Sequence, residues 1–142
     1  MTFHGFACAA ICCAFVLADA ASAKTTLRQS VNLTDMGLST EGGEVRLYRV
    51  ERRGGRFCRI EAVHYGETGK ATLLFEFGAT LFAAERSQYR YGAPIYVDPN
   101  VKVRLDSRLT LKSREGRKKL GANFLEYKSY FPTGEIARCA RR

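Results

Sequence analysis

Few residues of this chain have the types and spacing that catalysis needs. After residue 23, the 142-residue sequence contains a single histidine, His64, and two cysteines, Cys58 and Cys139. His64 could act as a general base only beside a partner that positions it, and the sequence spacing supplies none. The chain has no His-x-Glu, His-Glu-x-x-His, Gly-x-Ser-x-Gly or Cys-x-x-Cys motif. We therefore expect no enzyme, no catalytic residue, no cofactor and no metal site.

A small hydrolase is the alternative, because a lone histidine or a carboxylate can serve as a base. The base would be His64, or a carboxylate pair drawn from Glu61, Glu76 and Glu85. Only the separation and the pKa values of two carboxylates distinguish such a pair from ordinary surface residues. Neither quantity can be read from the sequence.

The N-terminal segment predicts export. Residues 6–18 are apolar, a length typical of a signal-peptide core and too short to cross about 30 Å of hydrocarbon as a helix. Ala21, Ser22 and Ala23 follow, and small residues at the first and third positions suit signal peptidase, so we place the cut between Ala23 and Lys24. The stretch before residue 6 has no Lys or Arg, which leaves a lipid anchor or an uncleaved anchor as alternatives. We expect a periplasmic or secreted protein without a transmembrane anchor.

Cleavage changes the cysteine count. Three of the five cysteines leave with the signal, and in an oxidising compartment the remaining pair, Cys58 and Cys139, most simply forms one disulfide. Closing so long a loop stabilises a fold by about 4–5 kcal/mol in the chain-entropy model. The sequence therefore predicts a disulfide that ties the C-terminal tail to the middle of the chain.

The charge points to the kind of partner. The formal net charge is +9, and it rises to +10 on cleavage because Asp19 is the only charged side chain removed. A field of this sign attracts anionic partners, although many basic exported proteins are simply soluble. We expect a non-enzymatic binding protein whose partner is an acidic protein or an anionic envelope component, such as lipopolysaccharide, an acidic glycan or a lipid head group. Export disfavours nucleic acid, and a structural envelope component is a further alternative.

The most distinctive segment is 85–99, where arginine and tyrosine alternate. On a strand, Tyr89 and Tyr91 share one side. The other side carries Arg86, Gln88 and Arg90. Stacking on the rings and hydrogen bonds from guanidinium could bind sugars or bases, and Tyr96 belongs to the same candidate surface. The alternative is that the tyrosines pack against neighbouring strands.

Further basic residues form three groups. One lies on an expected strand: Lys102, Arg104, Arg108 and Lys112. The next follows directly: Arg114, Arg117, Lys118 and Lys119. If these two groups adjoin, they make one cationic surface; the alternative is a solvated charged face. A third group contains only arginines, whose planar fork suits carboxylate and phosphate: Arg46, Arg49, Arg52, Arg53, Arg56 and Arg59.

The elements that must position these residues are short strands joined by tight turns. Period-two alternation starts at Glu44, and Gly54-Gly55 predicts a hairpin turn because glycine tolerates a positive φ. A phase shift between Leu47 and Tyr48 indicates a bulge. Alternation over residues 101–112 predicts a strand with one core face and one cationic face. We expect an all-β domain, an antiparallel meander that forms a small barrel or sandwich with one disulfide.

The C-terminal part departs from this pattern. Four bulky residues recur at helical spacing: Leu120, Phe124, Tyr127 and Phe131. They predict one helix within residues 114–131, which Ser113 caps and Pro132 ends. Gly116 and Gly121 leave a hairpin as the alternative. The expected organisation is a signal peptide at 1–23, an irregular arm at 24–43 and a single β-rich domain at 44–142.

Overall fold

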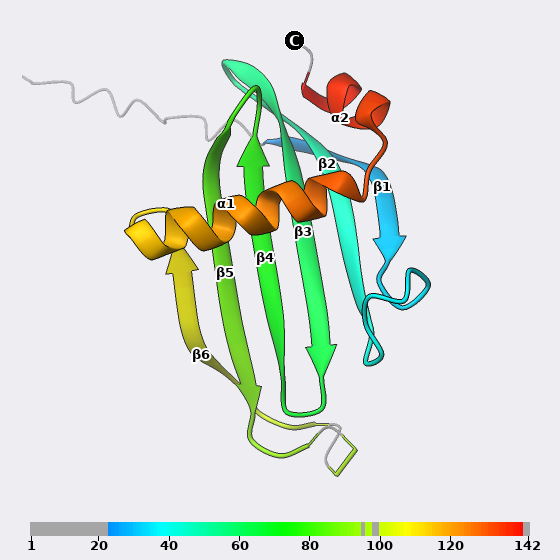
Figure 1. The fold of residues 1–142 in the computed structure, drawn as a ribbon, viewed down its shortest axis with the longest axis vertical. Coiled ribbons are helices and arrows are strands. Elements are labelled where there is room, and N and C mark those ends of the chain that lie inside the picture. Colours follow the sequence, from blue (N-terminus) through cyan, green and yellow to red (C-terminus); the bar gives the residue numbers. More distant parts are fainter. Residues whose placement is uncertain (1–22, 95, 98–99, 141–142) are drawn as a thin grey trace, which may run out of the picture.

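The computed structural model describes residues 23–94, 96–97 and 100–140. Apart from Ala23, the predicted signal peptide lies outside these residues. Six strands pair in chain order as one antiparallel sheet, and two helices follow. The elements are β1 (Lys24–Asn32), β2 (Gly43–Arg52), β3 (Gly55–Gly66), β4 (Gly69–Phe77), β5 (Leu81–Tyr91), β6 (Val103–Thr110), α1 (Arg114–Ser129) and α2 (Thr133–Ala140). The predicted meander is confirmed, but the sheet is not closed into a barrel; helices cover one side of it (Figure 1).

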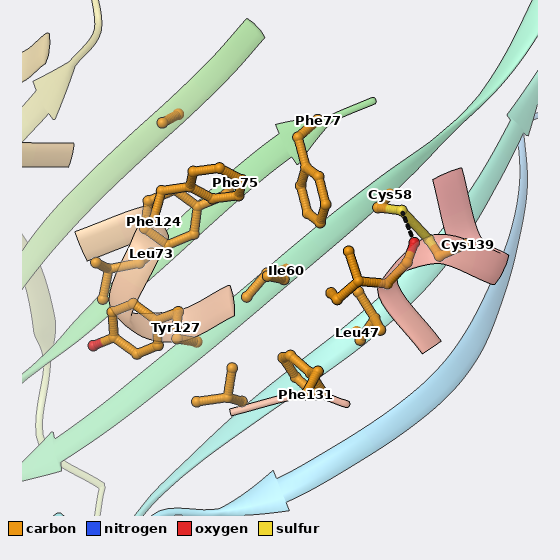
Figure 2. Close-up of a cluster of buried hydrophobic side chains, with 14 of the residues drawn as sticks. Leu47, Cys58, Ile60, Leu73, Phe75, Phe77, Phe124, Tyr127, Phe131 and Cys139 are labelled. Atoms are coloured by element: carbon orange, nitrogen blue, oxygen red, sulfur yellow. Dashed lines mark hydrogen bonds between the residues drawn. A yellow bond between two sulfur atoms is a disulfide. The ribbon is translucent and has the colours of Figure 1, made fainter. Parts of the chain in front are cut away.

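The two sides of the sheet have different roles. On the side that α1 crosses, the helix side, Ile60 of β3 lies between Leu47 of β2 and Phe75 of β4. Figure 2 shows these side chains packed with Phe124 and Tyr127 of α1 into one apolar core. The alternate residues of the same strands face the other side, the open side. In Figure 1 the lower ends of β3, β4 and β5 extend beyond α1, so part of the helix side is not covered by that helix.

Helix α1 begins where sequence and packing agree. The Ser113 hydroxyl accepts a hydrogen bond from the Gly116 N–H at 2.9 Å, which satisfies an otherwise free amide of the first turn. A Cβ at Gly116 would overlap the carbonyl oxygen of Thr110, so glycine lets the helix start directly against the end of β6. The helix predicted from the bulky stripe is confirmed, and the alternative hairpin is wrong.

A second helix, α2, was not predicted. Pro132 accepts a hydrogen bond from the Ile136 N–H at 3.2 Å, so the proline that ends the first helical stretch also begins the next. Cys139 on α2 is bonded to Cys58 on β3, with the two Cα atoms 5.6 Å apart, inside the range that disulfides span. The predicted disulfide is confirmed, and it fastens α2 to the sheet (Figure 2).

The prediction of an irregular arm at residues 24–43 is corrected over its first part. Residues 24–32 form the edge strand β1, paired with β2 along its length. The extra residue Arg28 makes a bulge opposite Leu47 and Tyr48, the position where the sequence indicated one, but the bulge is on β1. This insertion breaks the alternation of β1, and a strand at the edge of a sheet buries few side chains, so its sequence carries little strand signal.

Candidate functional site

The alternating segment lies on β5, with its two sets of side chains on opposite sides of the sheet. Arg86 is opposite the core residue Leu73, which places Arg86, Gln88 and Arg90 on the helix side. Tyr89 and Tyr91 face the open side. There the ammonium group of Lys70 lies 5.5 Å from the centre of the Tyr89 ring, so this tyrosine packs across to β4. The arginines, which are exposed, are the more accessible half of the segment.

Two of the arginines face each other across strands. Arg90 of β5 lies directly opposite Arg104 of β6, and like charges in such a position destabilise a sheet. Asp106 offsets part of this repulsion, because its Oδ2 lies 3.4 Å from an Nη of Arg90. Arg104 makes no ion pair with any residue that the structure describes. Lys102 lies two residues before Arg104 and so shares its side of the sheet. We call these four basic residues of the helix side the basic strip: Arg86, Arg90, Lys102 and Arg104.

A bulge in β6 shapes this arrangement. Gln88 pairs with Ser107 and Tyr89 with Leu105, so Asp106 is an extra residue without a partner on β5. The bulge turns Asp106 toward Arg90, and bulges commonly re-aim side chains in this way beside functional sites. It also corrects the prediction of one core face and one cationic face over residues 101–112.

The residues of β6 on either side of the bulge differ in phase. Val103 and Leu105 face the open side, where they are 49% and 43% exposed, while Leu109 packs against the core. Arg104 faces the helix side, but Arg108 faces the open side and pairs with Glu85 at 3.2 Å. The basic residues of this strand therefore do not form one continuous face.

A hollow of about 870 Å³ lies at the end of the sheet beside the basic strip. Its lining includes His64, Ala71, Gln88 and Arg90, which belong to the helix side of three neighbouring strands. Arg90 is the basic-strip residue in this lining, which also contains the carboxylates Glu41, Glu67 and Asp106. Gly69 also lines it, and a Cβ there would overlap the carbonyl oxygen of Tyr89. Glycine at this position thus lets the end of β4 approach the backbone of β5 closely.

His64 is tied to helix α1. Its Nε2 contacts the hydroxyl group of Tyr127. Burial lowers the pKa of His64, and the positive charge of Arg86 lowers it further, while Glu126 acts in the opposite direction. Burial raises the pKa of Tyr127 to about 12. The phenol therefore keeps its proton, and Nε2 of the imidazole is already engaged in a hydrogen bond with the hydroxyl group.

The carboxylates considered for hydrolysis lie on the open side and are ion-paired. Arg59 lies 2.7 Å from Glu76 and 3.5 Å from Glu61. Glu61 and Glu85 flank Leu74 in one row across the sheet, at the rim of a hollow of about 400 Å³. Most of the third arginine group is used in such ion pairs with glutamates: Arg46, Arg49, Arg52, Arg56 and Arg59.

The basic residues around the start of α1 have separate roles. Arg117 donates to the carbonyl oxygens of Leu111 and Lys112, at 3.2 and 3.0 Å, and so holds the turn between β6 and α1. Lys119 pairs with Glu115 at 2.6 Å. Three others are exposed and form no ion pair within the described part of the chain: Lys112, Arg114 and Lys118. Tyr96 lies in the loop after β5 and is exposed, apart from the tyrosines of the strand.

Some features of this site had no clear sequence signal. Tyr127 was predicted only as part of the helical stripe, and its contact with His64 joins residues 63 positions apart. Asp106 was predicted as one more residue of a regular strand. Among the described residues, no cluster of His, Cys, Asp and Glu could hold a metal ion, and no helix has the length and apolar character to cross a membrane. Comparisons with protein-family models, with curated proteins and with solved structures found no match to this chain.

Proposed function

We propose that this chain is an exported binding protein that engages an anionic partner through the basic strip and the hollow beside it. The observation that carries the proposal is the placement of Arg90 directly opposite Arg104. Such a pair costs stability in the free protein, and a bound anion between the two guanidinium groups removes that cost. A partner that places negative charge between the two arginines relieves their repulsion. The free energy released in this way adds to the binding affinity.

The distribution of charge over the two sides supports the same function. On the open side, glutamates neutralise most of the arginines, as in the pairs of Arg59 with Glu76 and Arg108 with Glu85. Around the helix side and on α1, the basic side chains that form no ion pair with a described residue include Arg86, Lys102, Arg104, Lys112, Arg114, Arg117, Lys118 and Lys128. The excess positive charge of the chain is thus concentrated away from the open side, where it can attract an acidic surface.

The remaining features agree with binding outside the cytoplasm. The disulfide between Cys58 and Cys139 is typical of an oxidising compartment, as the signal-like N-terminus also indicates. His64 is held by Tyr127, which favours a structural role over that of a base. Partners with the required chemistry are lipopolysaccharide, an acidic glycan, an anionic lipid head group or an acidic protein.

Binding to heparin and to phosphatidylglycerol vesicles over a range of salt concentrations tests this function. We expect the affinity to fall as salt rises, because exposed charges are screened. The charge-reversal variant R90E/R104E should release heparin at clearly lower salt than R52E/R53E, a control with the same net charge at the opposite end of the sheet. Binding that is independent of salt, or equal elution of the two variants, would contradict the proposal.

A further inference from the structure

Resting on the function proposed above, we infer that Arg90 and Arg104 together bind a phosphomonoester group. The two residues are a directly opposed pair on the helix side of β5 and β6. Opposed Cα atoms in an antiparallel ladder are about 4.5–5.5 Å apart, so both guanidinium groups reach the same volume above the sheet. The class of ligand is therefore set by which anion can accept hydrogen bonds from both guanidinium groups at the same time.

Both guanidinium groups keep free donors. Arg104 forms no ion pair within the described residues, and Arg90 has one long contact, 3.4 Å, to Asp106. A guanidinium carries five N–H donors in a rigid fork, so one carboxylate contact leaves most of the donors of Arg90 available. Asp106 lies on the bulge and holds the Arg90 side chain from one flank, which limits the directions in which the fork can point.

A phosphomonoester fits this pair better than other common anions. It has three terminal oxygens and a charge of about −1.5 to −2 near pH 7, so it can accept from both forks while it balances two positive charges. A carboxylate has one negative charge and two oxygens in a plane, which a single fork satisfies. A phosphodiester likewise has one negative charge. Because Asp106 already offsets part of the charge of Arg90, the preference for a phosphomonoester rests mainly on its three terminal oxygens, which both forks can share.

The surroundings leave room for the group that carries the phosphate. Gln88 lies two residues before Arg90 on the same side, and its amide nitrogen donates to the carbonyl oxygen of Lys70 at 3.3 Å. That bond fixes the side chain and leaves its own carbonyl oxygen as an acceptor for a hydroxyl group. Ala71 and Gly69 line the adjacent hollow of about 870 Å³. A phosphorylated sugar, soluble or as part of a lipid head group, has the polar groups to occupy this space.

The experiment compares three probes. Vesicles with phosphatidic acid present a phosphomonoester, and vesicles with phosphatidylglycerol, adjusted to the same surface charge, present a phosphodiester. Glucose 6-phosphate, measured against glucose, represents a soluble source. The test variant R90K/R104K keeps both charges and removes both forks. Its control R52K/R53K makes the same exchange at the opposite end of the sheet, and thermal unfolding shows that both variants are folded.

We expect the wild-type protein and the control to bind phosphatidic acid roughly tenfold more tightly than phosphatidylglycerol, because charge-assisted bidentate bonds add to the general attraction. R90K/R104K should lose this preference and still bind phosphatidylglycerol as the wild type does. Binding of glucose 6-phosphate alone, also lost in R90K/R104K, would support the same site with a soluble ligand.

Two outcomes overturn the inference. One is the absence of any preference for a phosphomonoester, on vesicles and in solution. The other is a preference that R90K/R104K retains. In both, the proposed function stands if phosphatidylglycerol binding still weakens with salt and with R90E/R104E. If phosphatidylglycerol binding changes neither with salt concentration nor in R90E/R104E, the proposed function itself is contradicted.

Discussion

His64 of β3 and Tyr127 of α1 meet across the interface between sheet and helix, imidazole Nε2 to phenol hydroxyl. The two rings also touch edge to face, with their centres 5.8 Å apart. Arg86 stands close enough to lower the pKa of His64, so one end of the basic strip adjoins this contact. The pair therefore positions α1 next to the surface that we propose for binding.

Replacing Tyr127 with phenylalanine should destabilise the protein by about 1–3 kcal/mol, because it leaves a half-buried imidazole nitrogen without its hydrogen-bond partner. The matched control is Y130F, which removes an exposed hydroxyl that donates to Glu126 at 2.9 Å. That change should cost no more than about 0.5 kcal/mol. Urea unfolding measures both values. Equal losses in the two variants would show that the contact with His64 contributes nothing specific.

Stability should fall as the pH is lowered from about 7.5 to about 5.5. Burial lowers the pKa of His64 in the folded protein below its ordinary value of 6.5, so the unfolded chain binds the proton first. The free energy of unfolding must then decrease as pH falls through 6.5, until the folded protein also becomes protonated. H64Q should remove this slope. Glu44 and Glu115, whose pKa values are lowered by Arg46 and Lys119, lose their contribution only at lower pH.

The pH experiment compares the free energies of unfolding of wild type and H64Q at each pH. A slope of the same size in both proteins would mean that another group titrates, and would contradict the role given to His64. If the slope disappears in H64Q, the difference curve reports the shift of a single site.

Two glycines of α1 should respond in opposite ways to alanine. A Cβ at Gly116 would overlap the Thr110 carbonyl oxygen, so G116A should destabilise the protein by about 1–3 kcal/mol through forced movement of the helix. No heavy atom outside the helix backbone and neighbouring residues lies within 4 Å of a Cβ at Gly121. G121A should therefore stabilise by about 0.5–1 kcal/mol, the gain in helix propensity. Thermal unfolding of both variants checks the signs, and a stabilising G116A would contradict the close approach.

Removing the charge of Asp106 should strengthen anion binding. D106N frees the Arg90 fork from its ion pair, and exposed pairs of this kind are worth about 0.2–1 kcal/mol, so the affinity for phosphatidylglycerol vesicles should rise by up to about fivefold. D35N makes the same change of net charge in the loop after β1 and serves as control. An equal rise in both variants would mean that only net charge matters and that Asp106 has no local role.

Several features could be predicted because they depend on neighbouring residues. The alternation from Arg86 to Tyr91 follows from the two-residue period of a strand, and the turn at Gly54 adopts the positive φ that its sequence indicates. The start of α1 follows from the cap at Ser113. The disulfide followed from the cysteine count once the predicted signal peptide was set aside.

By itself, the sequence determined the meander, the first helix, the disulfide pairing and which side chains of β5 share a side. Only the tertiary structure decided that β1 joins the sheet, that α2 follows α1 and that His64 meets Tyr127. It also decided which cations remain unpaired: Arg104 lies opposite Arg90 while Arg108 turns to Glu85, because a single inserted residue, Asp106, shifts the phase of β6. The register between strands is set by contacts between distant parts of the chain, and no local pattern contains that information.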